Sequence, residues 1–223
     1  MAKDLGCEVV LVRHAHSTAN LKGILAGRDN RVSLSPRGKA EAEQLATYLS
    51  TMEFDAVFSS PLRRCLDTLA PYLSQTKKKV NIREDLIEME YGRWSGKPLA
   101  VLSKQDMWKT IQSRPSTVRF PGGESFSEMS TRANQVILDE SKRHRRILVL
   151  SHGDVIKAIA AFHLGSPLDS FQRISIDPAS ISIIRLPSSH VITLNSTSHL
   201  IREKASGAGK RDKFHLGGGQ GKL

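Results

Sequence analysis

Short apolar runs alternate along the chain with longer segments in which apolar residues recur at helical spacing. Three of these runs, at 7–13, 56–58 and 147–150, are compact and bounded by polar turns, which is typical of strands buried on both faces of a sheet. A further short strand is expected near 80–82. Alternating segments at about 180–186 and 190–195 are expected to complete the sheet. Because helices of ordinary length separate most of these segments, we predict a mostly parallel sheet.

Capping signals mark where several helices are expected to begin. Ser35-Pro36 supplies an N-cap and an N1 proline, and Pro61 is expected to start a second helix. Ser125–Glu128 has the pattern of a capping box and predicts a long helix to about His144. Another helix is expected after Ser151-His152-Gly153. The predicted fold is therefore an α/β three-layer sandwich, with a mostly parallel central sheet and helices on both faces.

Length and composition are those of a folded protein with a full apolar core. The chain has 223 residues, of which 39% are hydrophobic and 25% charged, and this argues against a disordered or fibrous chain. We expect a single domain over residues 1–202 and a flexible, basic, glycine-rich tail over 203–223. No apolar run is long enough to span a bilayer. Cys7 and Cys65 form no C-x-x-C pair, so we expect a reducing compartment and a cytoplasmic location, without a membrane partner.

The formal net charge of +11 changes this ordinary picture. Basic residues gather at Lys77–Lys79, at Lys142–Arg146 and in the tail. Such a protein attracts anions, so nucleic acid, anionic membranes and phosphorylated small molecules are all possible partners. Aromatic residues make up only 5% of the chain and none interleaves with the basic clusters, whereas nucleic-acid platforms need stacking side chains. Nucleic-acid binding is therefore disfavoured as the main function.

Histidine and arginine residues stand where the predicted strands end. The first strand ends in Arg13-His14, the strand at 147–150 leads into Ser151-His152-Gly153, and the helix after the second strand begins near Arg63 and Arg64. In a parallel sheet, ligands bind outside the carboxyl ends of the strands. Two imidazoles and at least two guanidinium groups are thus expected at one edge, beside helix N-termini. This combination predicts a phosphate-binding site.

Two other kinds of site are weaker alternatives. A metal site made of His14, His16 and His152 would have no carboxylate or thiolate partner at ligand spacing. The segment Gly207–Lys210 has Arg211 where a phosphate-binding loop needs serine or threonine. We therefore expect no metal.

Four motifs, in order, resemble those of the histidine phosphatase superfamily, which includes the cofactor-dependent phosphoglycerate mutases. They are Arg13–Asn20, Ser60–Thr68, Leu86–Gly96 and Ser151–Gly153. The stretch Ser151–Leu186, together with Pro121–Ser125, further resembles a bacterial branch described as probable phosphomutases. The resemblance implies a phosphoglycerate mutase-like fold and phosphoryl transfer through a phosphohistidine.

The resemblance also implies a role for individual residues. His14 matches the nucleophile, and Glu88 matches the proton donor, with Glu90 as the alternative two residues further along. The groups that would surround the transferred phosphoryl oxygens are Arg13, Arg64 and His152 with the backbone of Gly153.

Further positions are expected to bind substrate or phosphate. These are Ser17, Asn20 and Gly27, with a turn or a helix cap as the alternative role of Ser17. One position departs from the family pattern: Ala15 stands where the family has glycine, directly after the nucleophile. A methyl group there narrows the space for backbone approach to a phosphate.

The predicted activity is metal-independent hydrolysis of a small, anionic phosphomonoester, with no cofactor. The alternative is a mutase that uses the same site and needs a bisphosphorylated primer. Hydrolysis is favoured because the segment from Gly96 to Pro121 is short for a lid that encloses two phosphates. The sequence leaves the identity of the metabolite and the oligomeric state open.

Overall fold

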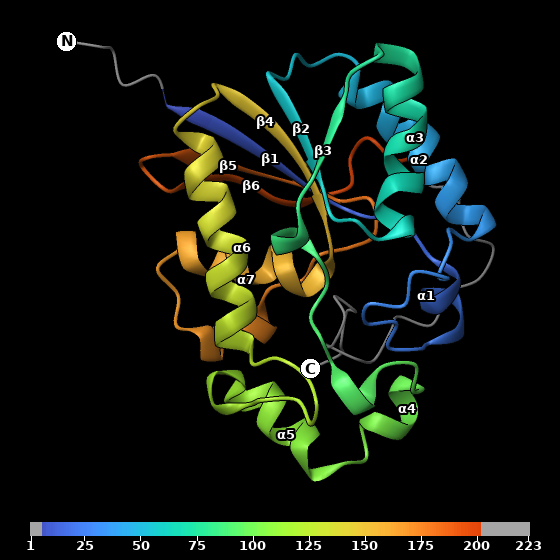
Figure 1. The fold of residues 1–223 in the computed structure, drawn as a ribbon, viewed down its shortest axis with the longest axis vertical. Coiled ribbons are helices and arrows are strands. Elements are labelled where there is room, and N and C mark those ends of the chain that lie inside the picture. Colours follow the sequence, from blue (N-terminus) through green and yellow to red (C-terminus); the bar gives the residue numbers. More distant parts are fainter. Residues whose placement is uncertain (1–5, 202–223) are drawn as a thin grey trace.

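A computed structural model describes residues 6–201 of the chain. Within this range six strands form one sheet in the order β3-β2-β4-β1-β5-β6 (Figure 1). The strands are β1 (Cys7–Arg13), β2 (Ala56–Ser59), β3 (Val80–Ile82), β4 (Arg146–Ser151), β5 (Ile181–Leu186) and β6 (His190–Ser196). The first four are mutually parallel, whereas β5 pairs antiparallel with both β1 and β6. The prediction of a mostly parallel sheet is confirmed.

Helices follow most of the strands and lie largely where capping signals predict them. They are α1 (Thr18–Lys22), α2 (Pro36–Leu49), α3 (Arg63–Thr76), α4 (Leu99–Leu102), α5 (Asp106–Ser113), α6 (Phe126–Ser141) and α7 (Gly153–His163). Between residues 6 and 201, four 3₁₀ turns complete the path: Glu84–Leu86, Gly92–Trp94, Pro115–Thr117 and Leu168–Arg173.

Two helix boundaries differ from the prediction. The third helix begins at Arg63 rather than at Pro61, because Leu62 is extended and acts as the N-cap. The long helix α6 ends at Ser141 and not near His144. Beyond it, the carboxylate of Asp55 accepts hydrogen bonds from the backbone N–H groups of residues 145 and 146, which lead the chain into β4.

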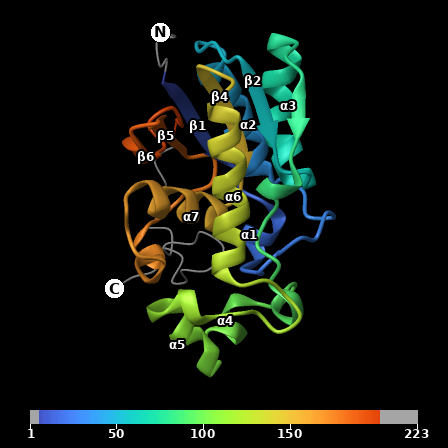
Figure 2. The ribbon, with the colours of Figure 1, turned by 60° about the vertical axis from the view of Figure 1, so that its left-hand side comes forward.

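Alternate residues of the central strands build two apolar cores. Val9 and Leu11 of β1 face α6 and α7, while Val10 and Val12 face α2 and α3. In Figure 2, α6 passes in front of the strands and α2 lies behind them. The expected three-layer sandwich is therefore present, and it fixes the carboxyl ends of β1, β2 and β4 at one edge of the sheet.

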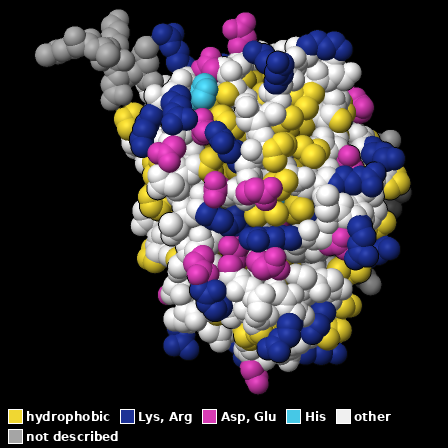
Figure 3. Space-filling view, in the orientation of Figure 1, with side chains coloured by type: hydrophobic (Ala, Val, Ile, Leu, Met, Phe, Trp, Pro, Cys, Tyr) yellow, Lys and Arg dark blue, Asp and Glu magenta, His cyan; other side chains and the backbone are white. Residues whose placement is uncertain are grey.

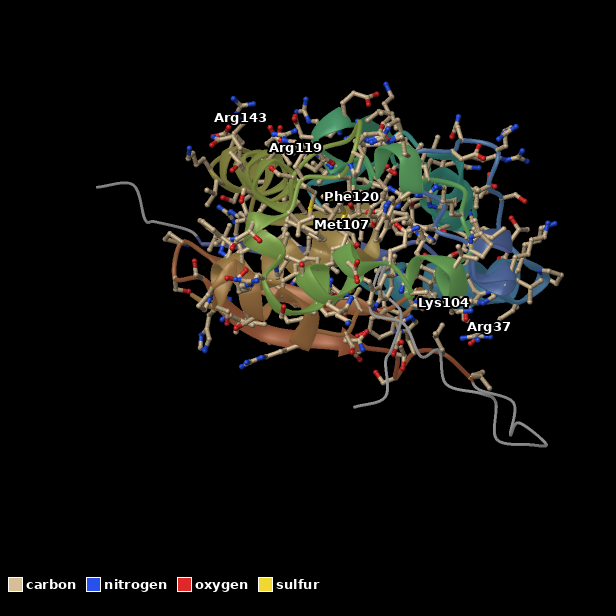
Figure 4. The ribbon with its side chains drawn as sticks, turned by 90° about the horizontal axis from the view of Figure 1, so that it is seen from below. Arg37, Lys104, Met107, Arg119, Phe120 and Arg143 are labelled. Atoms are coloured by element: carbon tan, nitrogen blue, oxygen red, sulfur yellow. The ribbon has the colours of Figure 1, made fainter. Side chains whose placement is uncertain are left out.

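A small helical segment lies below this edge (Figure 1). It contains α4 and α5 and is joined to the rest by aromatic contacts: Trp94 stacks on Trp108 with ring centroids 6.4 Å apart, and Phe120 lies 5.5 Å from Trp94. Seen from below, Phe120 and Met107 lie near the middle of the molecule, whereas Arg119 lies nearer its edge (Figure 4). Packing of these aromatic rings fixes the segment relative to the sheet.

The basic clusters are partly neutralised where the structure describes them. Lys142 forms an ion pair with Asp139, and Arg146 with Glu8. The face shown in Figure 3 has acidic side chains interspersed among the basic ones. The expected basic tail at 203–223 lies outside the described residues. Across residues 6–201 no helix is both long enough and apolar enough to span a membrane.

Candidate active site

The carboxyl ends of β1 and β4 bring two histidines together. Arg13 pairs with Ser151 in the parallel register, and the backbone N–H of His14 donates to the Ser151 carbonyl at 3.0 Å. His14 and His152, the next residues, therefore leave the sheet side by side, with ring centroids 5.2 Å apart and ring planes at 60°. This is the convergence that the strand ends predict.

The His14 ring is held in one orientation by the backbone carbonyl of the next residue, Ala15. Its Nδ1 lies 2.9 Å from the carbonyl oxygen of Ala15, so Nδ1 carries the proton and donates it. The Ala15 N–H in turn donates to Thr68 Oγ1 at 3.0 Å. Burial, together with the guanidinium groups of Arg64 and Arg13, lowers the pKa of His14 well below 6.5. The ring is thus neutral at physiological pH, with the lone pair on Nε2.

Two buried arginines supply positive charge next to this ring. Arg64, in the first turn of α3, donates from Nη2 to the Gly27 carbonyl at 2.8 Å and from Nη1 to the Asp29 carbonyl at 3.4 Å. Arg13 donates from Nη1 to the Ile176 carbonyl at 2.6 Å. These contacts with backbone carbonyls orient the two guanidinium groups. Arg63, by contrast, pairs with Asp67 in an ion pair exposed to solvent.

His152 is fully buried at the N-cap position of α7. Its Nε2 lies 2.7 Å from Ser60 Oγ, which follows β2. Burial and the nearby charge of Arg64 lower the pKa of His152 well below 6.5. Gly153 is the first residue of α7, so its backbone N–H lies at the positive end of the helix dipole.

Glu88, which follows the 3₁₀ turn Glu84–Leu86, is the carboxyl group that lies beside His152. Its side chain is buried, with Oε2 3.8 Å from His152 Nδ1, while Oε1 accepts a hydrogen bond from the Met89 N–H at 2.9 Å. Burial raises the pKa of Glu88 to about 7, and the charge of Asp154 adds to this rise, whereas Arg64 opposes it. A carboxyl group with this pKa can hold or release a proton near neutral pH.

The alternative acid, Glu90, lies elsewhere. Its side chain is 35% exposed and points to Arg28, with Glu90 Oε2 3.6 Å from Arg28 Nε. The geometry therefore favours Glu88 over Glu90 as the group that faces the histidines.

The other predicted binding residues have contacts within the protein. Ser17 is the N-cap of α1 and forms a capping box with Asn20, whose Oδ1 accepts from the Ser17 N–H at 2.9 Å. Gly27 has φ of +54° and turns its carbonyl toward Arg64. The first two thus stabilise the turn after β1, and Gly27 orients the pocket arginine.

Among residues 6–201, no group of three or more histidine, cysteine, aspartate or glutamate side chains is arranged to hold a metal ion. His16, a member of the weaker alternative site, places Nδ1 2.8 Å from Ser35 Oγ and donates its backbone N–H to Glu41.

Several buried polar residues behind the site were not predicted. Tyr91 donates its hydroxyl to Asp154 Oδ2 at 2.6 Å, and Lys157 Nζ lies 3.4 Å from Asp154 Oδ1. Ser60, at the start of the second motif, was also missed. A lysine and an aspartate three residues apart usually mark an exposed helix face, so the sequence carries no signal that this pair is buried.

Comparison with known proteins agrees with this geometry. Phosphoserine phosphatase 1 of Hydrogenobacter thermophilus is 34% identical over 201 residues, which cover 86% of this chain and 94% of that protein. A 2,3-bisphosphoglycerate-dependent phosphoglycerate mutase of Cytophaga hutchinsonii is 35% identical over 159 residues, 68% of this chain and 74% of the other. The structure of phosphoserine phosphatase from Entamoeba histolytica in complex with 3-phosphoglyceric acid matches with a TM-score of 0.79 and 26% identity, over 87% of this chain and 100% of the other.

The family model described as histidine phosphatase superfamily (branch 1) matches residues 9–196. That range contains all four motifs and the carboxyl ends of β1 and β4, which position the two histidines at one edge of the sheet. The chain belongs to the histidine phosphatase superfamily.

Proposed function

We propose that the protein hydrolyses small, anionic phosphomonoesters through a phosphohistidine on Nε2 of His14. The observation that carries the proposal is the state of this imidazole. It is neutral, its Nδ1 is bound to the Ala15 carbonyl, and two buried guanidinium groups lie nearby. Such a nitrogen is a nucleophile in a setting that attracts an anion.

In the first step, His14 Nε2 attacks the phosphorus atom and forms an N–P bond. The P–O bond to the alcohol breaks, and the departing oxygen takes the proton of Glu88. The two buried arginines, the His152 ring and the N-terminus of α7 stabilise charge on the three remaining oxygens. Because phosphoryl transfer depends mainly on positioning and charge stabilisation, each such donor contributes about 10²–10³-fold to the rate.

In the second step, the ionised Glu88 takes a proton from water. The water oxygen attacks phosphorus, the N–P bond breaks, and its electron pair returns to His14. Inorganic phosphate leaves, and Glu88 is again protonated. We propose that the arginines supply the positive charge of both steps and that neither metal nor organic cofactor takes part.

The substrate class follows from the charge of the site and from the relatives. The two arginines match the negative charge of a substrate's phosphate group. The phosphoserine phosphatases to which the chain is similar support a small phosphorylated metabolite as the substrate. Two buried free thiols, Cys7 and Cys65, support a reducing compartment such as the cytoplasm.

A mutase remains the second candidate, because the relative from Cytophaga hutchinsonii is a phosphoglycerate mutase. A mutase would return the phosphoryl group to an alcohol and would require a bisphosphorylated primer. The wider match to the phosphoserine phosphatase favours hydrolysis.

A rapid-quench reaction with a radiolabelled phosphomonoester tests the proposal. We expect acid-labile label on the wild-type protein, no label on His14→Ala, and inorganic phosphate released without any added acceptor. Full turnover by His14→Ala would refute the phosphohistidine. Release that depends on an alcohol acceptor would favour the mutase.

A further inference from the structure

The loop at residues 27–29 contacts both halves of the site. The carbonyl groups of Gly27 and Asp29 accept hydrogen bonds from Arg64, the pocket arginine. Arg28, between them, turns the other way, and its Nε donates to the backbone carbonyl of Glu88 at 2.9 Å. These three consecutive residues thus contact both Arg64, on the side of the site proposed to bind phosphate, and Glu88, on the side of the proposed acid.

A second arginine holds the same backbone from the other direction. Arg132 of α6 donates from Nη1 to the carbonyls of Asp85 and Ile87, each at 2.7 Å, and from Nη2 to that of Glu88 at 3.2 Å. Three carbonyl groups in a stretch of four residues therefore converge on one guanidinium group. Arg28 and Arg132 both donate to the carbonyl of Glu88, from different elements.

One carboxylate joins the two arginines. Glu124 Oε1 lies 3.0 Å from Arg28 Nη2 and 2.7 Å from Arg132 Nη2, and Glu124 Oε2 accepts from Arg132 Nε at 3.1 Å. Its Oε1 also accepts the Glu90 N–H at 2.9 Å. Burial opposes ionisation here, but the hydrogen bonds and charge of Arg132 prevail and lower the pKa of Glu124. The side chain is only 14% exposed, so this pairing is shielded from solvent.

We infer that Arg28, Glu124 and Arg132 form an acid clamp that positions the carboxyl group of Glu88 for proton transfer to the leaving oxygen. The inference rests on the proposed function of Glu88. All three are positioning residues: Arg28 and Arg132 contact only the backbone carbonyl of Glu88, and Glu124 acts through these two arginines. Glu88 lies in irregular backbone after a 3₁₀ turn, where no helix or strand ladder holds it, and the clamp supplies the missing constraint.

The clamp has a consequence that a purely structural role does not have. A phenolate is a poor leaving group and needs the proton, whereas 2,4-dinitrophenolate leaves as the anion and does not. Loss of the clamp should therefore slow phenyl phosphate far more than 2,4-dinitrophenyl phosphate, although both are aryl phosphates. The comparison uses kcat/KM, which covers the steps up to the first irreversible transfer to His14.

We expect Glu124→Gln and Arg28→Met each to lower kcat/KM for phenyl phosphate by about 10–100-fold, because a small misplacement of a catalytic group is costly. The value for 2,4-dinitrophenyl phosphate should change little. Arg28→Met keeps the Arg132–Glu124 pair and an aliphatic stem, so it tests the clamp even if Glu124→Gln fails to fold. Circular dichroism and thermal unfolding monitor the fold of both variants.

Matched controls change neighbouring charges outside the clamp. Glu128→Gln removes the exposed ion pair with Arg119, which lies toward the edge in Figure 4, and glutamine preserves the capping box with Ser125. Arg31→Ala removes a side chain that is 91% exposed and pairs with Asp29. Both should retain wild-type kcat/KM on both substrates.

Glu88→Gln separates failure of the clamp from failure of the proposed function. If Glu88→Gln slows both substrates equally, the assignment of Glu88 as acid is wrong. If Glu88→Gln is selective for phenyl phosphate but Glu124→Gln and Arg28→Met are not, the acid assignment stands and the clamp is overturned. Selective loss in all three variants supports both.

Discussion

The pH dependence of hydrolysis should follow the unusual carboxyl group of Glu88. Burial, with the charge of Asp154, raises its pKa from 4.5 to about 7. As the proposed proton donor, Glu88 must be protonated before the first step, so activity is present below this pKa and falls above it. His14 must be neutral, and its pKa lies well below 6.5, so protonation of the nucleophile limits the rate only in more acidic solution.

The size of the effect follows from this pKa. About 90% of the protein carries the Glu88 proton at pH 6, about half at pH 7 and about 10% at pH 8. For phenyl phosphate, kcat/KM should therefore decline roughly tenfold for each pH unit above about 7. Once a phosphate dianion binds, its charge raises the pKa of the carboxyl group further, so the decline of kcat should occur at higher pH than the decline of kcat/KM.

The assay compares wild type with Glu88→Gln, in which the amide cannot titrate. Phosphate release from phenyl phosphate is followed between about pH 5 and pH 9, and the ratio of the two kcat/KM values cancels the titration of the substrate itself. The ratio should be about 10²–10⁴ in acid and should shrink as the pH rises through about 7. A ratio that stays constant from about pH 6 to pH 9 would exclude Glu88 as the titrating acid, because another group would then control the decline.

Three further perturbations test individual contacts. Because the native protein binds the Glu88 proton more tightly than the unfolded chain does, the free energy of unfolding should fall by about 3 kcal/mol as pH rises from 4.5 through about 7. Glu88→Gln should avoid this loss, and urea unfolding at both ends of the pH range measures it. Equal pH dependence in the two proteins would contradict this prediction. Ser60→Ala removes the 2.7 Å contact to His152 Nε2, so it should lower the free energy of unfolding by about 1–3 kcal/mol and kcat/KM by about tenfold. An unchanged kcat/KM would show that Ser60 does not orient the His152 ring. In Gly123→Ala the new Cβ would clash with the Glu90 carbonyl oxygen, so the backbone must shift and the free energy of unfolding should fall by about 1–3 kcal/mol. An unchanged melting temperature would mean that the turn accommodates the methyl group without cost.

The phosphate side of the site was predictable from the sequence because it depends on strand ends. Buried strands are recognisable by their apolar runs, and parallel pairing then brings His14 and His152 to one edge. Arg64 could be placed for a similar reason, since it stands in the first turn of the helix that follows β2. Periodicity and one assumption about strand direction were sufficient for the two histidines, whereas the motif resemblance was needed to choose Arg64 over Arg63.

The acid side was less predictable because irregular segments build it. The motif resemblance alone selects Glu88 over Glu90; alternation in an extended segment would place both on one face. The acid clamp joins positions 28, 88, 124 and 132, which are up to 104 residues apart, and no local pattern links them. The helix boundaries at Arg63 and Ser141 were missed because no local pattern marks the extended Leu62 or shows that Asp55 accepts hydrogen bonds from the backbone just before β4.

The central position of β1 in the sheet divides the site into a stiff half and an adjustable half. This strand, which leads into His14, is paired along its length with β4 on one side and β5 on the other, so opening it requires breaking two ladders at once. Its amide hydrogens should be among the slowest of the chain to exchange, while those of the segment around Glu88 exchange sooner. Substitutions near Glu88, outside this residue and the acid clamp, can therefore accumulate without disturbing the strand ends that position His14 and His152, and one scaffold can acquire new substrates.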